Sequence, residues 1–220
     1  SRQIIVVREG INVKSVKPVS ASKVEVEFEV PADSSPGLYP IRLVSETGLS
    51  NVMMFSVGVL PNVEEKEPNS EFATPQVIEK NVTVEGAVAR EDEDYYVVEL
   101  KEGESLTAEL EGVRIKKGRS NPFFDPYVAI LNAERFEMAT SDDAPLLQQD
   151  CLCSMRAPAD GKYIIVVRDS SFGGSNDRYR LHVGSFPRPI AVVPAGGPPG
   201  ALIDMTFVSA TGDAWIEKVQ

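Results

Sequence analysis

The sequence is poor in the residues that most often build catalytic centres, with one histidine and two cysteines among 220 residues. A single histidine excludes a zinc site with two histidine ligands, and neither the G-x-S-x-G nor the G-x-x-x-x-G-K-[ST] motif occurs. His182 alternates onto the strand face opposite Leu181, so we expect an exposed histidine there. These observations predict that the chain is not an enzyme.

Long apolar runs and an excess of positive charge are also missing. No run of 18 apolar residues occurs, so we predict no insertion into a membrane. The net charge of -11 argues against nucleic acid as a partner, because its phosphates would be repelled. No signal peptide is recognisable, and Ser1 leads almost directly into an apolar run at 4–7, so we expect a part of a longer chain.

The two cysteines, Cys151 and Cys153, are separated by one residue. On a strand they point to the same face, and a disulfide between such close neighbours would be strained. A metal pair or a redox pair stays open, although no histidine or third cysteine lies nearby. We interpret them first as small buried apolar side chains.

What the sequence does contain is turn residues and short alternating segments, which predict an all-β protein. It has 16 glycines and 16 prolines. Residues 23–30 alternate without a break between valine or phenylalanine and charged residues, which is typical of a half-buried strand. Turn residues at 31–37 separate this segment from an apolar segment at 38–44, and a further strand is predicted at 52–59.

The first sixty residues resemble the Ig-like (IPT/TIG-like) modules of large bacterial surface and secreted proteins. The resemblance rests on VPADSSPGLY at 30–39, TGLSN at 47–51 and FSVG at 55–58. It covers the later part of such a module, so we predict a partial Ig-like β-sandwich over residues 1–61.

An acidic joint follows at residues 62–72. Within it, Glu65, Glu67 and Asn69 bring carboxylate and amide oxygens close together, and a second acidic group lies one predicted strand later at 91–94. Hard cations prefer oxygen ligands at this density, Ca²⁺ before others. The alternative is a solvated acidic linker, because charge runs on acidic proteins are usually exposed.

The longer second half shows an ordered set of short motifs. They are Glu65-x-Glu67-Pro68-Asn69, Asp94-Tyr95-Tyr96, Asp125-Pro126, Asp142-Asp143 and Asp160-Gly161-x-Tyr163. Together they resemble the bacterial pre-peptidase C-terminal (PPC) domain, which is related to the collagen-binding domains of clostridial collagenases. The resemblance covers about residues 63–185 and implies a non-catalytic, jelly-roll-like β-sandwich of eight to ten strands, which we place at 73–185.

The same resemblance implies a calcium site in the joint. Glu65, Glu67 and Asn69 match the first three ligand positions, while Ser70 replaces an aspartate of the family. From the second acidic group Asp94 is the first match and Glu91 the next, with Asp92 as an alternative. We therefore predict metal ligands at Glu65, Glu67, Asn69, Glu91, Asp92 and Asp94.

Two tyrosines are candidates for a binding surface. Tyr95 takes the face opposite Tyr96, and with Tyr127 it could offer apolar area with a polar tip to a partner. Packing of both rings within the fold is the alternative. A further acidic group (Asp125, Asp142, Asp143 and Asp150) would bind a cation only if its loops converge.

The tail breaks the strand pattern. Residues 186–200 contain the prolines and glycines of a linker, and residues 201–220 resemble the start of a further Ig-like module or strands that complete the first. We predict a structural or adhesive, extracytoplasmic segment of a longer secreted or cell-surface bacterial protein, with other modules of the same chain as partners. The alternative is a module that binds protein fibres or polysaccharide, attached to a secreted peptidase or other enzyme.

Overall fold

The structure, a computed structural model, describes residues 3–116, 124–145 and 147–220. The chain divides into two compact units, of which the first comprises Ser1–Val59 with Val113–Pro122 and the second Leu60–Gly112 with Phe123–Gln220. Nearly all regular structure in the described residues is strand, the exception being the short helix α1 (Val113–Lys116). The prediction of an all-β protein is confirmed.

The first unit contains two antiparallel sheets. Strand order in the larger sheet is β1-β4-β5, with β6 also paired to β4, and β2 and β3 form a separate hairpin. The bounds are β1 (Gln3–Val6), β2 (Asn12–Pro18), β3 (Val24–Glu29), β4 (Gly37–Ser45), β5 (Gly48–Leu49) and β6 (Met53–Val57). The rings of Phe28 on β3 and Phe55 on β6 lie 4.8 Å apart and join the two sheets.

Tyr39 anchors the first unit, because it is the large aromatic side chain that this unit buries completely. Its hydroxyl donates a hydrogen bond to the Ser35 carbonyl at 2.7 Å. The same backward contact recurs in the second unit, where the Tyr163 hydroxyl donates to the Ala159 carbonyl at 2.9 Å. In both places a G-x-Y segment opens a strand, and the tyrosine fixes the turn before it.

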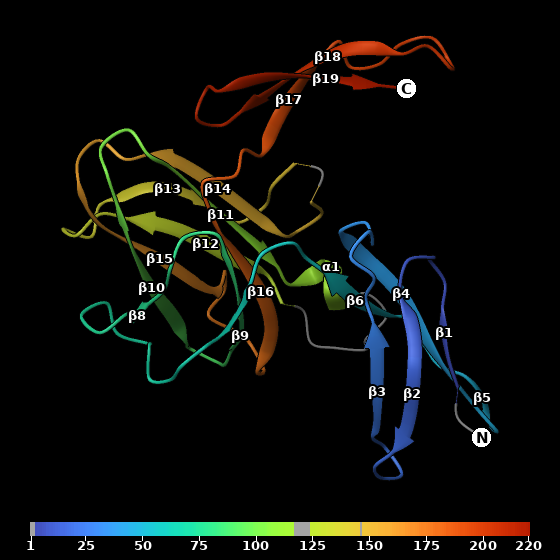
Figure 1. Ribbon diagram of the computed structural model, residues 1–220. Helices are drawn as coiled ribbons and strands as arrows, with labels where there is room; N and C mark the ends of the chain where they lie inside the picture. Colours follow the sequence, from blue (N-terminus) through green and yellow to red (C-terminus); the bar gives the residue numbers. More distant parts are fainter. Residues whose placement is uncertain (1–2, 117–123, 146) are drawn as a thin grey trace. The chain divides into compact units, whose positions relative to one another are not determined.

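The second unit is dominated by two five-stranded sheets, whose ribbons face each other in Figure 1. One sheet has the order β13-β12-β15-β10-β8 and the other β14-β11-β16-β9-β7. The bounds are β7 (Asn62–Glu64), β8 (Gln76–Val77), β9 (Val82–Val88), β10 (Glu93–Leu100), β11 (Ser105–Glu111), β12 (Pro126–Leu131), β13 (Glu137–Ser141), β14 (Cys151–Arg156), β15 (Gly161–Asp169) and β16 (Asp177–Gly184). The predicted sandwich over residues 73–185 is therefore joined by β7 from the acidic joint.

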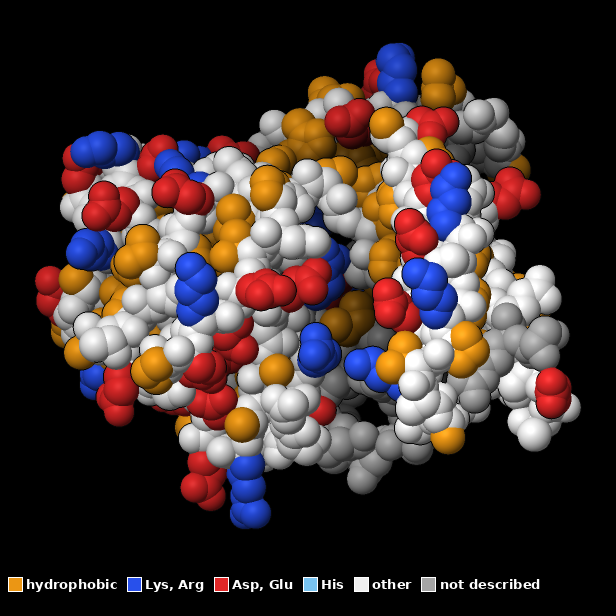
Figure 2. All heavy atoms as spheres, turned by 60° about the horizontal axis from the view of Figure 1, so that its bottom comes forward, with side chains coloured by type: hydrophobic (Ala, Val, Ile, Leu, Met, Phe, Trp, Pro, Cys, Tyr) orange, Lys and Arg blue, Asp and Glu red, His pale blue; other side chains and the backbone are white. Residues whose placement is uncertain are grey.

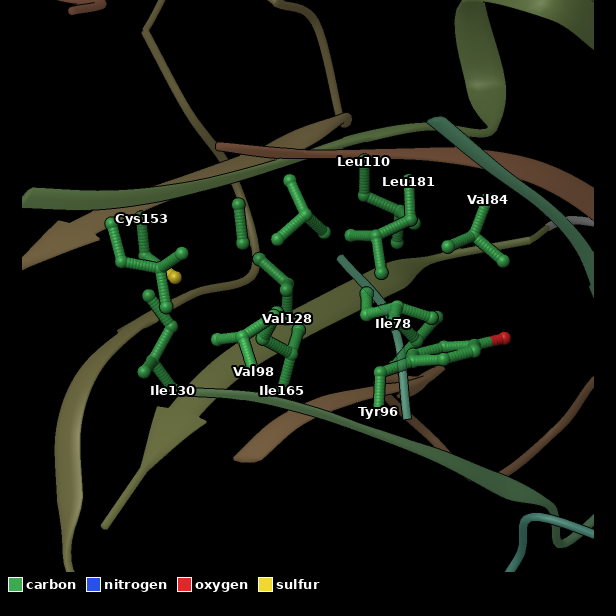
Figure 3. Close-up of a cluster of buried hydrophobic side chains, with 14 of the residues drawn as sticks. Ile78, Val84, Tyr96, Val98, Leu110, Val128, Ile130, Cys153, Ile165 and Leu181 are labelled. Atoms are coloured by element: carbon green, nitrogen blue, oxygen red, sulfur yellow. The ribbon is translucent and has the colours of Figure 1, made fainter. Parts of the chain in front are cut away.

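The core lies between these sheets. Alternate residues of β10 and β15 point inward, and Figure 3 shows Val98 and Ile165 from one sheet facing Leu110 and Leu181 from the other. Both cysteines are free and buried, so their interpretation as apolar core residues is confirmed. In Figure 3 the ring of Tyr96 belongs to this cluster, but its hydroxyl points to the edge of it.

The acidic joint crosses from one sheet to the other. Strand β7 pairs in parallel with β9, and β8 pairs in parallel with β10, whereas the other pairings in the second unit are antiparallel. The Glu65 N–H donates to the Glu85 carbonyl at 3.1 Å, and the Tyr95 N–H donates to the Asn69 carbonyl at 2.9 Å. The joint is therefore hydrogen-bonded to both sheets at one end of the sandwich.

The C-terminal residues form a third, separate sheet of the second unit. Its order is β17-β18-β19, with bounds Pro189–Val193, Ile203–Ser209 and Ala214–Val219. Residues 189–193, which we assign from the sequence to a linker, are thus a strand, because the apolar run Ile190–Val193 pairs with β18. Within the described residues these strands pair only with one another, so whether they complete the first module stays a prediction.

Among the described residues no helix has the length and apolar character needed to span a bilayer. Figure 2 shows acidic and basic side chains interspersed on the face that it presents, with small groups of apolar side chains between them. The negative net charge is therefore not visible there as one continuous acidic surface.

Candidate metal centre

The acidic joint meets the open end of the sandwich at a cluster of three carboxylates. Ligand atoms of Glu65, Glu67 and Asp94 all lie within 4.8 Å of one another. Glu65 follows β7, Glu67 lies two residues further along the joint, and Asp94 projects inward from β10. Among the described residues, this is the one group of at least three acidic, histidine or cysteine side chains spaced closely enough to hold an ion.

Two buried tyrosines hold the Glu65 carboxylate in place. The Tyr96 and Tyr179 hydroxyls donate to Glu65 Oε1 at 2.8 Å and 3.0 Å. The Ala87 N–H donates to Glu65 Oε2 at 2.9 Å, and the Tyr179 hydroxyl also lies 2.6 Å from Asp94 Oδ2. The Tyr179 hydroxyl thus lies between the carboxylates of Glu65 and Asp94 and contacts both from the side of the hydrophobic core.

Sequence reasoning did not identify Tyr96 and Tyr179 as part of this centre. Their hydroxyls lie 2.5 Å apart, and both rings belong to the hydrophobic core. Alternation along β10 identifies Tyr96 as a core residue, but it cannot show that the ring ends at a polar cluster. That position depends on the pairing of β16 with β9 and on the path of the joint.

Gly86 makes room for this arrangement. It lies opposite Tyr179 in the pairing of β9 with β16. A Cβ atom at Gly86 would lie 2.5 Å from the Tyr179 Cζ and hydroxyl atoms and 2.9 Å from Glu65 Oε1. Real Cβ contacts are not this short, so a glycine is needed here for space.

Two oxygen atoms at the centre are buried and have no hydrogen-bond partner in the part of the chain that the structure describes. They are Asn69 Oδ1 and Asp94 Oδ1, and both side chains have no exposed surface. The Asn69 amide nitrogen lies 3.5 Å from Glu65 Oε1, so the side chain is next to the carboxylates. A buried oxygen without a partner costs about 1–3 kcal/mol, and a cation would supply the missing partner for both.

The electrostatics of Asp94 are unfavourable in the absence of a counter-charge. Burial, and then the nearby Glu65 carboxylate, raise the pKa of Asp94 to about 9, against the hydrogen bond from Tyr179. A carboxylate buried beside a second carboxylate favours its neutral form unless a cation lies close to both. The donor set therefore suits a positively charged ligand.

The spacing and the donor types fit calcium. A Ca–O bond measures about 2.3–2.6 Å, so two ligand oxygens of one ion lie at most about 5 Å apart. The carboxylate spacing falls within that limit. Three carboxylates and one amide oxygen are hard ligands of the kind that Ca²⁺ takes, and backbone carbonyls or water would complete its six to eight positions.

The other predicted ligands lie outside the three-carboxylate group. Asp92 accepts hydrogen bonds from the Ser70 hydroxyl at 2.9 Å and from the Ala89 N–H at 3.2 Å. Glu91 is exposed and has a φ of 58°, and its Oε1 lies 3.8 Å from the Nε of Arg90. Ser70 therefore meets Asp92, and the structure ties the second acidic group to the joint through this contact as well as through Asp94.

The two candidate binding tyrosines share the outer face of the β10–β15–β12 part of their sheet. Tyr95 pairs with Val166 and Tyr127 with Arg168, two residues further along β15. Both rings are partly buried, and the Arg168 guanidinium carbon lies 3.8 Å from the Tyr127 ring centroid. Their hydroxyls donate to Glu93 and Glu137. The binding role of this face stays a prediction.

The expectation of an exposed His182 is wrong. Its relative exposure is 9%, and its Nδ1 lies 2.8 Å from the Thr83 hydroxyl while its Nε2 lies 3.4 Å from Glu111 Oε2. The order hydroxyl, imidazole, carboxylate resembles that of a hydrolase triad. Thr83 is completely buried, however, so its hydroxyl offers no accessible nucleophile.

In the further acidic group (Asp125, Asp142, Asp143 and Asp150), Asp150 binds a backbone N–H group. Asp150 Oδ1 accepts from the Gly112 N–H at 2.8 Å. Burial raises the pKa of Asp125, and the neighbouring Asp143, Asp169 and Asp142 raise it further. Among the described residues these side chains do not form a group spaced closely enough to share an ion.

Comparison with known proteins finds distant likenesses in structure. No protein-family model matches this chain, and no curated protein matches it. The pre-peptidase C-terminal domain of a collagenase from Bacillus anthracis is 15% identical, with a TM-score of 0.40, and the match covers 54% of this chain and 99% of that one.

Two further solved structures are similar over different shares of the chain. PliG from Aeromonas hydrophila, a periplasmic inhibitor of g-type lysozyme, is 16% identical with a TM-score of 0.37, covering 50% of this chain and 95% of that one. The secreted serine protease VesC from Vibrio cholerae is 12% identical with a TM-score of 0.33, covering 86% of this chain and 44% of that one. At these values the likenesses do not indicate a shared ligand or activity.

Proposed function

We propose that this chain is a calcium-stabilised structural segment of a longer extracytoplasmic protein. Its cation would bind where the acidic joint meets the sandwich, with Glu65, Glu67, Asn69 and Asp94 as ligands. The observation that carries the proposal is a pair of buried oxygens, Asn69 Oδ1 and Asp94 Oδ1, which have no hydrogen-bond partner among the described residues. The carboxylates of Glu65 and Glu67 lie next to them.

The position of the centre gives the ion a mechanical role. Glu65, Glu67 and Asn69 belong to the joint, whereas Asp94 belongs to β10 of the sandwich. An ion held by both sides would fix the joint to the sandwich, in addition to the hydrogen bonds that link Glu65 to β9 and Asn69 to β10. Because the joint leads from the first unit into the second, ordering it would restrict how the chain enters the sandwich.

The proposed location follows from the affinity that such a site would have. Calcium sites of extracellular modules work at dissociation constants of about 10⁻⁴–10⁻³ M. The serine at position 70 removes one charged ligand relative to the pattern that the joint resembles, which would place this site toward the weaker end. Such a site fills only where calcium is abundant, as outside the cytoplasm, and other modules of the same chain would be its neighbours.

The test is thermal unfolding of the 220-residue chain in calcium and in EDTA. Because only the folded site binds, calcium at ten times the dissociation constant should add about 1.4 kcal/mol to the free energy of unfolding. For a chain of this size we expect a rise in Tm of about 3–6 °C.

The matched variants are Glu67→Gln and Glu64→Gln, which remove the same charge at neighbouring positions. Glu67 belongs to the carboxylate group, whereas Glu64 is exposed on β7 and lies outside it. The calcium-dependent rise should vanish in Glu67→Gln and persist in Glu64→Gln. A wild-type Tm that is equal in calcium and EDTA would refute the proposal.

A second candidate function is binding of a protein fibre or a polysaccharide, which the position of Tyr95 and Tyr127 on the same outer face of their sheet favours. Two tyrosine rings on one face of a sheet could stack on a sugar or on a proline-rich chain. Retention on collagen or cell-wall glycan beads that is lost in Tyr127→Ala would support this function. No retention of the wild-type chain on either matrix would count against it.

A further inference from the structure

The sheet that carries Asp94 has a small apolar strip on its outer face, separate from the main core. Val97, Ala129, Ile164 and Val166 have relative exposures of 6%, 1%, 4% and 5%, yet none belongs to the core cluster between the sheets. We call these four residues the outer strip. Their burial means that other side chains cover this face of the sheet.

The strand register arranges the residues of the outer strip in two neighbouring rows that run across the strands. Val166 pairs with Tyr95 on one side and with Ala129 on the other, and Ile164 pairs with Val97. Side chains of directly paired residues lie on the same face of an antiparallel pair. Tyr95 therefore stands at the edge of the strip and points to the same side.

Phe72 links Tyr95, at the edge of this strip, to Arg135. The Phe72 ring meets the Tyr95 ring edge-on at 6.0 Å between centroids, and the Arg135 guanidinium carbon lies 4.3 Å from the Phe72 centroid. Arg135 lies in the turn between β12 and β13, while Tyr95 lies on β10, and β15 runs between β10 and β12. The Phe72 ring therefore connects side chains from the two sides of β15.

Phe72 comes from the acidic joint itself, three residues after Asn69. Three residues span at most about 10 Å, so the position of Asn69 limits where the Phe72 ring can lie. Asn69 is held by the hydrogen bond from the Tyr95 N–H and by the contact of its own N–H with Glu67 Oε2, at 2.9 Å each. A cation bound by Glu67 and Asn69 would hold this segment further.

We infer that the Phe72 ring covers the outer strip and that a cation bound in the joint holds the ring in this position. This inference rests on the proposed calcium site. Removal of the cation would free the segment that follows Asn69 and lift the Phe72 ring, so that the strip becomes accessible to water. The chain would then expose an apolar surface only where calcium is scarce.

The experiment is hydroxyl-radical footprinting of the 220-residue chain, read by mass spectrometry, in millimolar calcium and in EDTA. The oxidation rates of Phe72 and of the peptide with Ile164 and Val166 should rise severalfold in EDTA. Oxidation of the peptide with Leu110, a side chain that is completely buried in the main core, should stay unchanged. Calorimetric titration of the same sample with calcium reports binding independently.

Variants separate the cover from the cation. Phe72→Ala should expose the outer strip even in calcium, with calcium binding retained, and Arg135→Ala should expose it in part. Phe136→Ala is the control, because this ring is 68% exposed, and it should leave the strip protected. Near-ultraviolet circular dichroism checks that each variant is folded.

Each outcome decides a different claim. If calcium binds but the strip is equally protected with and without it, the coupling between cation and cover is overturned. If Phe72→Ala leaves the strip protected in calcium, Phe72 is not the cover. If the calorimeter shows no calcium binding, the proposed function fails together with the cation dependence, and the Phe72→Ala arm still decides whether the ring covers the strip.

Discussion

Replacement of Gly86 by alanine should destabilise the sandwich for a purely steric reason. Gly86 lies in β9 with a φ outside the left-handed region, so alanine is compatible with its backbone. The added Cβ would lie 2.5 Å from the Tyr179 ring and 2.9 Å from Glu65 Oε1. One of these side chains must move.

The magnitude follows from how firmly Tyr179 is held. The side chain is 1% exposed, and its hydroxyl oxygen lies 2.6 Å from Asp94 Oδ2 and 3.0 Å from Glu65 Oε1. The ring cannot shift without lengthening these contacts or displacing core neighbours. Overpacking of this kind costs about 1–3 kcal/mol. We expect about 2 kcal/mol, which lowers Tm by about 4–8 °C in a chain of this size.

The assay is urea denaturation in EDTA, which removes any contribution of bound cation. Gly161→Ala is the matched control, since nothing lies within 4 Å of a Cβ at that position and its φ is also outside the left-handed region. Gly161→Ala should be neutral or slightly stabilising, because alanine reduces the entropy of the unfolded chain. If Gly86→Ala is as stable as Gly161→Ala, the described packing of Tyr179 and Glu65 is wrong.

Further predictions concern side chains outside the candidate metal centre. Burial raises the pKa of Cys153 to about 12 and raises that of Cys151 as well, so the native chain should react with a thiol reagent at pH 8 far more slowly than the urea-unfolded chain; equal rates would contradict the burial of both. Asp169→Asn should cost about 1–3 kcal/mol at pH 7, because Asp169 accepts hydrogen bonds from the Asp125, Ser171 and Gly173 N–H groups. Burial raises the pKa of Asp169, but these hydrogen bonds outweigh burial and leave the pKa lowered. The stability that the ionised Asp169 contributes is therefore fully present above the unfolded pKa of about 3.9 and is lost as the pH falls through the folded pKa. In urea titrations at pH 3 the difference in unfolding free energy between Asp169→Asn and wild type should accordingly shrink.

The strands that alternate cleanly could be predicted from the sequence, because one face of each is buried in the main core. Tyr96, Val98 and Leu100 on β10 are examples, and all three are buried. Local alternation cannot reveal which strands pair, so the division into two five-stranded sheets needed the structure. The same limit explains β17, whose apolar run at 190–193 lies among prolines and glycines that indicate a linker.

The centre could be predicted where its members are neighbours in the sequence. Glu65, Glu67 and Asn69 are spaced by two residues, and their proximity is local. The contribution of Tyr179 is not local, since it lies 114 residues from Glu65. The error for His182 has a related cause: alternation identified its face correctly, but that outer face carries buried polar residues such as Thr83 and Glu111.

The most direct measurement of the central claim is a terbium titration with tyrosine excitation. Tb³⁺ takes oxygen ligands as Ca²⁺ does, and the Tyr96 and Tyr179 hydroxyls contact Glu65, which we propose as a ligand, so a bound ion should luminesce. We predict a saturable signal with one ion per chain that calcium displaces, that is weakened in Glu67→Gln and that is unchanged in Glu64→Gln. A signal that does not saturate, or one that both variants weaken equally, would contradict a calcium site in the joint.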